Sequence, residues 1–280
     1  MDILDNYSKS ILIETLELFK DVCEKLNIKF YLSHGTLLGA VKYKGFIPWE
    51  DDLDIMMSRK DFEVLKIYFL NNPSKEWSLG GAECGFYSLD FFGKFFNKKY
   101  YCLEEGRLLT HACIDIYILN EIKKADLKNY LKKLKFILAL STLPHKKVKY
   151  YDWYDSDLKI WFYYHWHQKQ IGSLKFVDNL LYKHLTKYDN QGDMYILLSP
   201  GIFDMAEKKT YNKDLFLRED VIVDFEGEKY LAPKGYDDIL KITYGENYMS
   251  EEPPLKEQEF KHSNYYLKEG EHFVCTYKYC

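Results

Sequence analysis

The stretch His34–Met57, HGTLLGAVKYKGFIPWEDDLDIMM, guides the interpretation of the whole chain. It begins with a turn of small residues, His34-Gly35-Thr36, and ends in an acidic cluster followed by apolar residues. If residues 52–57 form a strand, side chains alternate between its faces, so Asp52 and Asp54 share one face. Two carboxylates at this spacing suit a hard divalent cation such as Mg²⁺ or Mn²⁺, which would also relieve their repulsion. A solvated acidic turn before an ordinary strand has the same spacing, so both interpretations stay open.

A third acid lies inside the β-branched segment 113–119, CIDIYIL. A lone carboxylate in a buried strand is costly unless it is paired or binds a metal. By alternation Asp115 shares a face with Cys113 and Tyr117, and the isoleucines at 114, 116 and 118 form the opposite, core-facing row. If this strand lies beside residues 52–57, three carboxylates converge; otherwise Asp115 caps a neighbouring loop.

The small-residue turn and a later lysine are candidates for binding phosphate. Glycine at position 35 permits close approach of the backbone, and the helix expected from Leu37 to Val41 would present its N-terminus to an anion. Lys94 lies between aromatic residues in a region expected to form strands. We interpret it as a contact for an anionic donor, with an exposed strand lysine as the alternative.

Residues 34–55, HGTLLGAVKYKGFIPWEDDLDI, resemble the signature of the LicD family, HGTLLGAVRxxGFIPWDDDIDI. Gly93-Lys94 occupies the place of a family lysine, and residues 114–117 resemble the family's IDIFPLD segment. The resemblance extends over roughly residues 8–262, through segments similar to FEG, PxGYD and YGD at Phe225-Glu226-Gly227, 233–237 and Tyr244-Gly245. The chain departs from the family pattern at Lys42, Glu50 and Asn120, where the family has Arg, Asp and Asp.

The resemblance implies an α+β fold, with a nucleotidyltransferase-like mixed sheet flanked by helices and a helical elaboration. It implies transfer of phosphocholine from CDP-choline to a glycan or lipid-linked glycan acceptor, such as a teichoic acid, capsule or lipopolysaccharide precursor. On this basis Asp52, Asp54 and Asp115 are the metal-binding and catalytic residues and hold one or two Mg²⁺ or Mn²⁺ ions, with Asp115 also the general base. The donor-binding residues are His34, Gly35, Thr36 and Lys94.

Other functions remain compatible with these motifs. Fukutin-like relatives of similar sequence handle polyol phosphates, and phosphoethanolamine is a further substituent that this fold could transfer. A glycosyltransferase could use Asp-x-Asp to bind a sugar nucleotide through Mn²⁺, but it would place several parallel βαβ units before the acids. A non-catalytic binding protein of the same fold is the last alternative.

Length and charge set the domain organisation and exclude one class of partner. We expect the 280 residues to form a single domain, with a core at about 8–120 and 200–262 and a helical elaboration at about 122–200. Its hydrophobic content of 47% is enough for a sizeable core. The net charge of −4 argues against a nucleic-acid partner.

Cysteine usage and hydropathy predict a cytoplasmic protein. The six cysteines include no Cys-x-x-Cys pair, as expected for reduced thiols. The acidic start of the chain has no signal-peptide character, and no apolar run is long enough to span a membrane. Residues 123–143 form an expected Lys-rich amphipathic helix, whose basic face is either simply solvated or in peripheral contact with the inner face of a membrane.

Overall fold

The computed structural model describes residues 6–48, 50, 52–81, 92–104, 107–142, 179–198, 209–217, 219–250 and 266–269; at 81, 101–104, 107–111, 138–142 and 266–269 it describes the backbone alone. Residues 143–178 of the expected helical elaboration therefore lie outside the described residues. The chain forms two compact units, one built from residues up to Asn120 and from Tyr195 onward, the other from Glu121–Met194.

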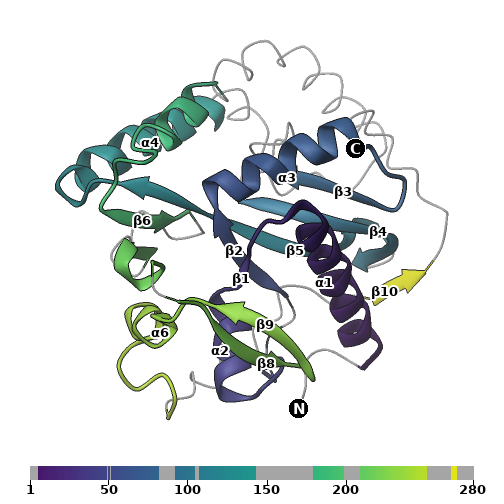
Figure 1. The fold of residues 1–280 in the computed structure, drawn as a ribbon. Helices are drawn as coiled ribbons and strands as arrows, with labels where there is room; N and C mark the ends of the chain where they lie inside the picture. The colour runs from purple at the N-terminus through teal and green to yellow at the C-terminus, as the bar shows by residue number, and fades with distance from the viewer. Residues whose placement is uncertain are drawn as a thin grey trace. The chain divides into compact units, whose positions relative to one another are not determined.

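A mixed sheet organises the first unit (Figure 1). β2 (Asp54–Ser58) runs parallel to β5 (Arg107–Ile122), whereas β1 (Tyr31–Leu32) pairs with β2, and β4 (Gly93–Glu104) with β5, in antiparallel register. The remaining strands of this sheet are β3 (Trp77–Gly81) and β10 (Tyr266–Glu269), antiparallel to β4, together with β6 (Met194–Leu197) and β7 (Thr210–Asn212). Helices flank this sheet, so the predicted α+β class is confirmed.

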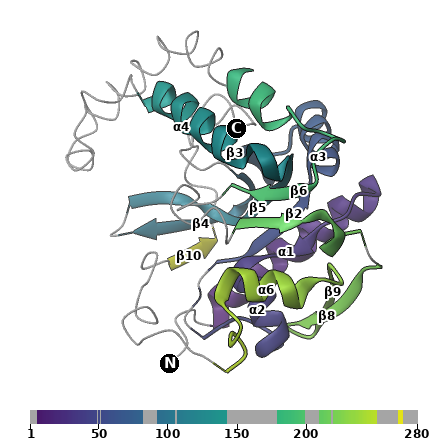
Figure 2. The same cartoon turned by 90° about the vertical axis from the view of Figure 1, so that its left-hand side faces the viewer.

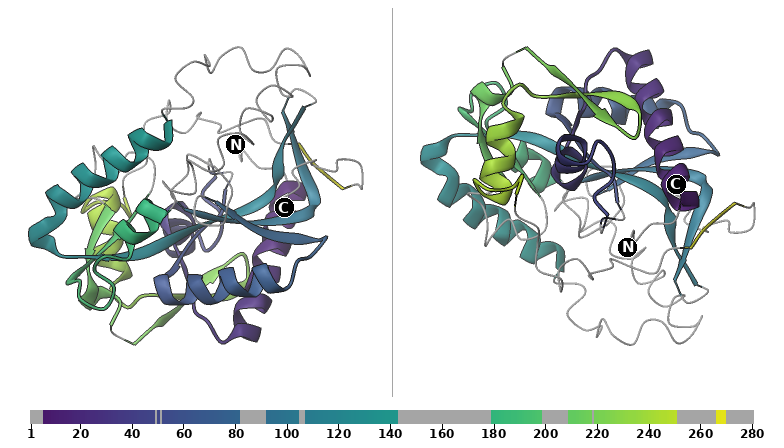
Figure 3. Two further views of the ribbon diagram at one scale, coloured as in Figure 1. Left: turned by 90° about the horizontal axis from the view of Figure 1, so that it is seen from above. Right: turned by 90° about the horizontal axis from the view of Figure 1, so that it is seen from below.

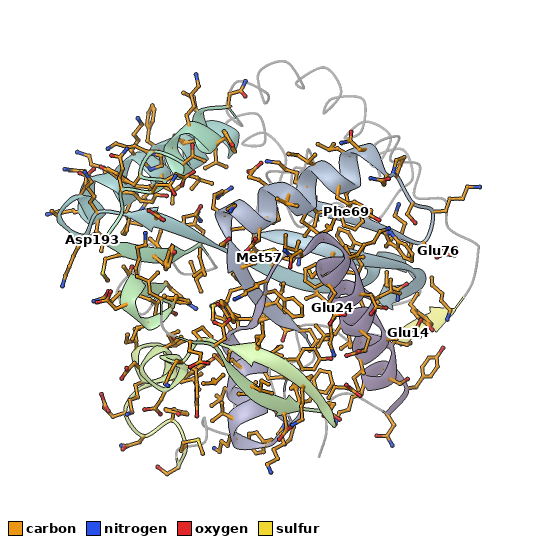
Figure 4. All side chains as sticks on the ribbon, in the orientation of Figure 1. Glu14, Glu24, Met57, Phe69, Glu76 and Asp193 are labelled. Carbon is orange, nitrogen blue, oxygen red and sulfur yellow. The ribbon has the colours of Figure 1, made fainter. Side chains whose placement is uncertain are left out.

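Two helices, α1 (Asn6–Leu26) and α3 (Arg59–Asn71), cover one face of the sheet (Figures 1 and 3). Ser58 ends β2 and caps α3, because its hydroxyl accepts a hydrogen bond from the backbone N–H of Asp61. Phe69 of α3, labelled in Figure 4, packs edge-on against Phe95, with ring centroids 5.9 Å apart. Phe19 of α1 packs against the same ring, with centroids 5.2 Å apart. These aromatic contacts join both helices to β4 in one apolar core.

A second group of elements surrounds α2 (His34–Lys42) (Figure 2). Its members are the hairpin of β8 (Val221–Phe225) and β9 (Glu228–Ala232), α6 (Tyr236–Tyr244) and the short 3-10 helix Lys213–Leu215. Glu226 and Gly227 turn the hairpin with φ angles of 49° and 86°, which is why glycine suits this turn. The Phe225-Glu226-Gly227 segment thus contains the turn of a hairpin, and Tyr244 ends α6.

Over its described residues the second unit is mostly helical, with a turn at 186–191 and with the last residues of β5 and the first of β6 at its ends. Lys124–Asp126 form a 3-10 turn that leads into α4 (Leu127–Thr142), and residues 179–185 are also helical. His184 stacks on Tyr130 of α4 with ring centroids 4.3 Å apart, and its Nε2 lies 2.9 Å from the Tyr130 carbonyl oxygen. Within the described ranges, none of the helices combines the length and apolar character needed to cross a bilayer.

Candidate active site

The backbone of Asp54 is held from two sides at the start of β2. The N–H of Ser33 donates to the Asp54 carbonyl at 3.0 Å, and the Asp54 N–H donates to the Thr36 hydroxyl at 2.8 Å. From the neighbouring strand, the N–H of Asp115 donates to the carbonyl of Leu53 at 2.9 Å. The first turn of α2 and strand β5 therefore fix the position of this carboxylate.

Four carboxylates gather around this point. Asp54 and Asp115 are direct neighbours in the parallel register of β2 and β5, as the sequence predicted for adjacent strands. The strand expected at 52–57 begins at Asp54, so Asp52 lies just before it and not within it. Burial, followed by the charges of Asp52, Asp115 and Glu50, nevertheless raises the pKa of Asp54 well above its ordinary value.

One carboxylate oxygen of Asp54 is buried without a hydrogen bond from the described residues to compensate for the loss of water. Asp54 is 7% exposed, and its Oδ1 is buried with no hydrogen-bond partner in the described part of the chain. A buried carboxylate oxygen without a partner costs free energy, so this position suits a group that supplies the missing partner.

Asp115 already has a cationic neighbour. Lys94 faces it across the antiparallel β4–β5 pair, and the Lys94 Nζ lies 2.6 Å from the Asp115 Oδ1. The same ammonium lies 4.8 Å from the centroid of the Phe92 ring. The structure thus places Lys94 at the acid cluster, where it is held by one carboxylate and one aromatic face.

Aromatic rings line the acids. The ring of Tyr117 lies 4.2 Å from that of His34 and 4.9 Å from that of Phe92, centroid to centroid. Burial, followed by the charges of Asp54 and Asp115, raises the pKa of Tyr117 well above its ordinary value. The tyrosine hydroxyl therefore stays protonated beside the carboxylates.

His34 has an unusual backbone and an unsatisfied ring nitrogen. Its φ of 40° lies in the left-handed region that non-glycine residues rarely adopt. Nδ1 lies 2.9 Å from the Ser33 hydroxyl, whereas Nε2 is buried with no partner among the residues described. Burial and the nearby charge of Lys209 lower the pKa of His34 to about 3, so the imidazole is neutral at physiological pH.

The His34-Gly35-Thr36 segment is the first turn of α2. The helix therefore begins at His34 and not at Leu37, where the sequence analysis expected it to begin. A Cβ added at Gly35 would lie 3.1 Å from the carboxyl carbon of Glu50, so glycine leaves room for that carboxylate. The N-terminus of a helix favours negative charge, which places Glu50 where an anionic group is stabilised.

Two further residues, Lys209 and Tyr244, were missed by sequence reasoning. The charge of Lys209 opposes the raised pKa of Asp54. Although Tyr244 is 39% exposed, burial of its hydroxyl end and the charges of Glu50 and Asp54 raise its pKa. Tyr244 belongs to a segment that resembles the family pattern, so a signal existed for it; none existed for Lys209, which lies outside every motif.

Two other motif positions have structural roles. Glu226 accepts a hydrogen bond from the Phe46 N–H at 2.9 Å and donates its own N–H to Lys44, which fixes the loop before the acids. Asn120 is 1% exposed, accepts a hydrogen bond from Arg59 and donates to the Ile118 carbonyl at 3.0 Å.

The donor chemistry of the cluster fits a hard divalent ion, since the groups are carboxylates and one oxygen of Asp54 is orphaned. Nevertheless, the described ranges contain no group of three or more His, Cys, Asp or Glu side chains arranged to hold one ion. Asp115 is instead paired with Lys94. Asp54, with its unpartnered oxygen, is therefore the residue best placed to receive a metal, and Asp115 would have to release Lys94 to join it.

Comparison with known proteins identifies a matching domain. Residues 27–117 match the family described as the LicD/FKTN/FKRP nucleotidyltransferase domain, which confirms the predicted resemblance. The lipopolysaccharide cholinephosphotransferase LicD of Haemophilus influenzae is 33% identical over 73 residues, 26% of this chain and 28% of that protein. Uncharacterized proteins of Rickettsia prowazekii and Rickettsia typhi are each 50% identical over 48 residues, 16% of this chain and 18% and 16% of their own lengths. The chain thus spans less than a third of the length of these curated relatives.

Proposed function

We propose that this chain, which carries a LicD-type nucleotidyltransferase domain in residues 27–117, is a metal-dependent transferase of phosphocholine. The donor would be CDP-choline and the acceptor a hydroxyl of a cell-surface glycan. The observation that carries the proposal is Asp54: a buried carboxylate with an orphaned oxygen, surrounded by acids and aromatic rings. The name of the Haemophilus relative supports choline phosphate as the transferred group and lipopolysaccharide as the acceptor.

Asp52 and Asp54 would hold Mg²⁺ or Mn²⁺, and Asp115 would join them once Lys94 has moved. When bound, the metal would neutralise charge on the donor phosphates and lower the pKa of the acceptor hydroxyl. Asp54 is suited to this role because a bound cation would favour its ionised form and would supply the partner that its Oδ1 lacks among the described residues.

The remaining groups would position the donor and balance its charge. The N–H groups of Gly35 and Thr36 at the start of α2 would bind phosphate oxygens, with Glu50 displaced from that place. Lys94 and Lys209 supply positive charge for the leaving nucleotide. The neutral His34 can offer its Nε2 for one hydrogen bond to donor or acceptor.

The transfer forms one bond and breaks one. The acceptor oxygen bonds to the phosphorus of phosphocholine, and the bond between that phosphorus and the CMP oxygen breaks. CMP leaves with the electron pair, and the hydroxyl proton passes to a carboxylate oxygen of Asp115. The aromatic rings of His34, Tyr117 and Phe92 favour choline over a polyol, since aromatic faces attract quaternary ammonium groups.

Donor turnover tests the proposal. The protein is incubated with CDP-choline, CDP-ethanolamine, CDP-ribitol or a sugar nucleotide, in Mg²⁺, Mn²⁺ or EDTA, and released nucleotide is measured. We expect metal-dependent release of CMP from CDP-choline. Release from CDP-ribitol or the sugar nucleotide alone would overturn the choline assignment and retain the metal site.

A matched pair of variants locates the activity. Asp54→Asn removes the orphaned carboxylate, whereas Asp220→Asn removes a partly buried carboxylate that is paired with Lys29 and Tyr31. Loss of turnover and of Mn²⁺-dependent donor binding in Asp54→Asn alone supports the site. Wild-type protein that neither turns over a donor nor binds one in the presence of metal would show that the transferase proposal is wrong.

A further inference from the structure

The second unit differs sharply in charge from the rest of the chain. Residues 121–194 contain 14 lysines against 8 aspartates and glutamates, whereas the chain as a whole has a net charge of −4. No arginine occurs in this range. This unit therefore carries a net positive charge, whereas the rest of the chain, which contains the acid cluster, is net negative.

Helix α4 presents much of this charge on one face. Tyr130, Leu134 and Ile137 are buried and pack inward. The opposite face carries Lys128, Lys132, Lys133, Lys135 and Phe136, all exposed, and these five residues are named here the α4 basic patch. The spacing of three and four residues places these side chains along one side of the helix.

Among the described residues, two acids lie close to the N-terminal end of α4. Asp126 is bound by Lys187 at 3.0 Å and by the Tyr188 hydroxyl, and Asp193, labelled in Figure 4, accepts the N–H of Lys124 at 2.8 Å. From Leu127 to Thr142 the sequence of α4 contains no acid. The basic patch is consequently not neutralised from within its own helix.

Phe136 gives the patch an apolar group at its C-terminal end. The ring is 63% exposed, and lysines lie one, three and four residues before it. An exposed ring among flexible ammonium groups is typical of surfaces that bind a lipid interface, where lysines contact headgroups and the aromatic side chain inserts. Nucleic-acid surfaces more often use arginine, whose planar group binds phosphate through two hydrogen bonds, and none is present here.

We propose that the α4 basic patch docks the protein on an anionic bilayer surface. Lys128, Lys132, Lys133 and Lys135 contact lipid phosphates and carboxylates, and Phe136 enters the boundary between headgroups and acyl chains. Clusters of four or more basic residues on an amphipathic helix are a known basis for binding anionic lipids. The proposal rests on unit 121–194 alone and stands independently of the transferase activity.

Vesicle flotation tests this docking. The full chain is mixed with vesicles of phosphatidylcholine alone or of phosphatidylcholine with 30% phosphatidylglycerol, and the bound fraction is measured against salt concentration. We expect binding only to the anionic vesicles, weakening as salt screens the charges. Each lysine near such a surface contributes about 1 kcal/mol, or about fivefold in affinity. Lys128→Gln/Lys132→Gln/Lys133→Gln is therefore expected to bind on the order of a hundredfold more weakly.

A control variant separates the patch from net charge. Lys60→Gln/Lys75→Gln/Lys229→Gln removes the same charge from exposed positions of the other unit and is expected to bind like wild type. Phe136→Ser tests insertion of the ring. We expect it to weaken vesicle binding, and this weakening should persist at high salt because it does not depend on charge. Equal weakening in both triple variants, binding to neutral vesicles, or binding to single-stranded RNA in place of vesicles would overturn the proposal. CMP release from CDP-choline in solution, measured on the same variants, reports separately on the transferase.

Discussion

Two clusters of buried polar side chains on the same sheet differ in whether their hydrogen-bonding groups have partners. Where α1 crosses β4, the Asn97 side chain donates to the Thr15 hydroxyl at 3.2 Å and accepts from the Lys99 N–H at 3.2 Å, and Thr15 donates to the Ile11 carbonyl at 2.8 Å. This network bridges a register shift in the β4–β5 ladder just after Asn97. At the acid cluster, by contrast, Asp54 Oδ1 and His34 Nε2 are both buried without a partner among the described residues.

The difference separates stabilising polar groups from binding ones. A satisfied buried network supports the fold, and removing one member leaves another unpaired. Orphaned buried groups cost stability and persist where a ligand or ion supplies the missing partner. The left-handed backbone of His34 adds a second cost at the same place. The predictions below test whether these two clusters really behave differently.

Asp54→Asn should have the largest effect. We expect turnover of CDP-choline to fall at least about a hundredfold, the size of effect typical for one electrostatic group in an active site. Without metal the same variant should be more stable, because folding no longer has to bury or protonate a carboxylate beside Asp52, Asp115 and Glu50. A gain of about 1 kcal/mol corresponds to a rise in Tm of roughly 2–4 °C. Calorimetry in EDTA checks this, and a lower Tm would contradict the interpretation of Asp54 as a destabilising, functional residue.

Asn97→Ala should show the reverse pattern. Thr15 and the Lys99 N–H each lose a partner, so we expect a loss of about 1–3 kcal/mol in the free energy of unfolding. Donor turnover by the folded fraction should be unchanged. Urea unfolding measures the loss, and a double-mutant cycle with Thr15→Val isolates the contact between the two side chains. Additive effects in that cycle would mean that the network is not a unit.

Much of the fold follows from local pattern. The alternation in residues 113–119 placed Ile114, Ile116 and Ile118 in the core, and all three are buried. Ser58 caps its helix and the turn at Glu226-Gly227 forms a hairpin, since both features depend on neighbours within a few residues. The start of β2 was misplaced because pairing with β5 begins at Asp54, where hydrogen bonds with Ser33 and with Thr36 in the first turn of α2 fix the backbone.

The site was less predictable where it depends on distant segments. The carboxylates at 52, 54 and 115 were identifiable from spacing and the cost of burial. That Lys94 pairs with Asp115 depends on the register of β4 against β5. Lys209 and Tyr244 reach the cluster from more than ninety residues beyond Asp115, and nothing in local periodicity reveals such an approach. Their contribution is set by tertiary packing.

His34 gives the comparison a pH dependence. Its folded-state pKa of about 3 lies below the ordinary value of about 6.5, so below pH 6.5 the unfolded chain takes up a proton that the folded chain refuses. Stability should therefore fall as pH decreases from 6.5 toward 3, with a loss of about 1–2 kcal/mol by pH 5. His34→Gln should remove this part of the pH dependence. Urea unfolding of both proteins at pH 7 and pH 5 tests it, and parallel losses would mean that other groups are responsible.

Asn120→Asp should have the smallest effect, and it decides to which cluster this position belongs. The new carboxylate would strengthen the hydrogen bond from Arg59, but it could no longer donate to the Ile118 carbonyl and would place two acceptors against each other. A charge-assisted bond gains about what the lost bond and the repulsion cost, so we expect a change in unfolding free energy within about 1 kcal/mol. Turnover of CDP-choline should be unaltered, because the Asn120 side chain forms hydrogen bonds within the protein and does not bind the donor. If turnover instead rose tenfold or more, position 120 would belong to the acid cluster and not to the satisfied polar groups that stabilise the fold.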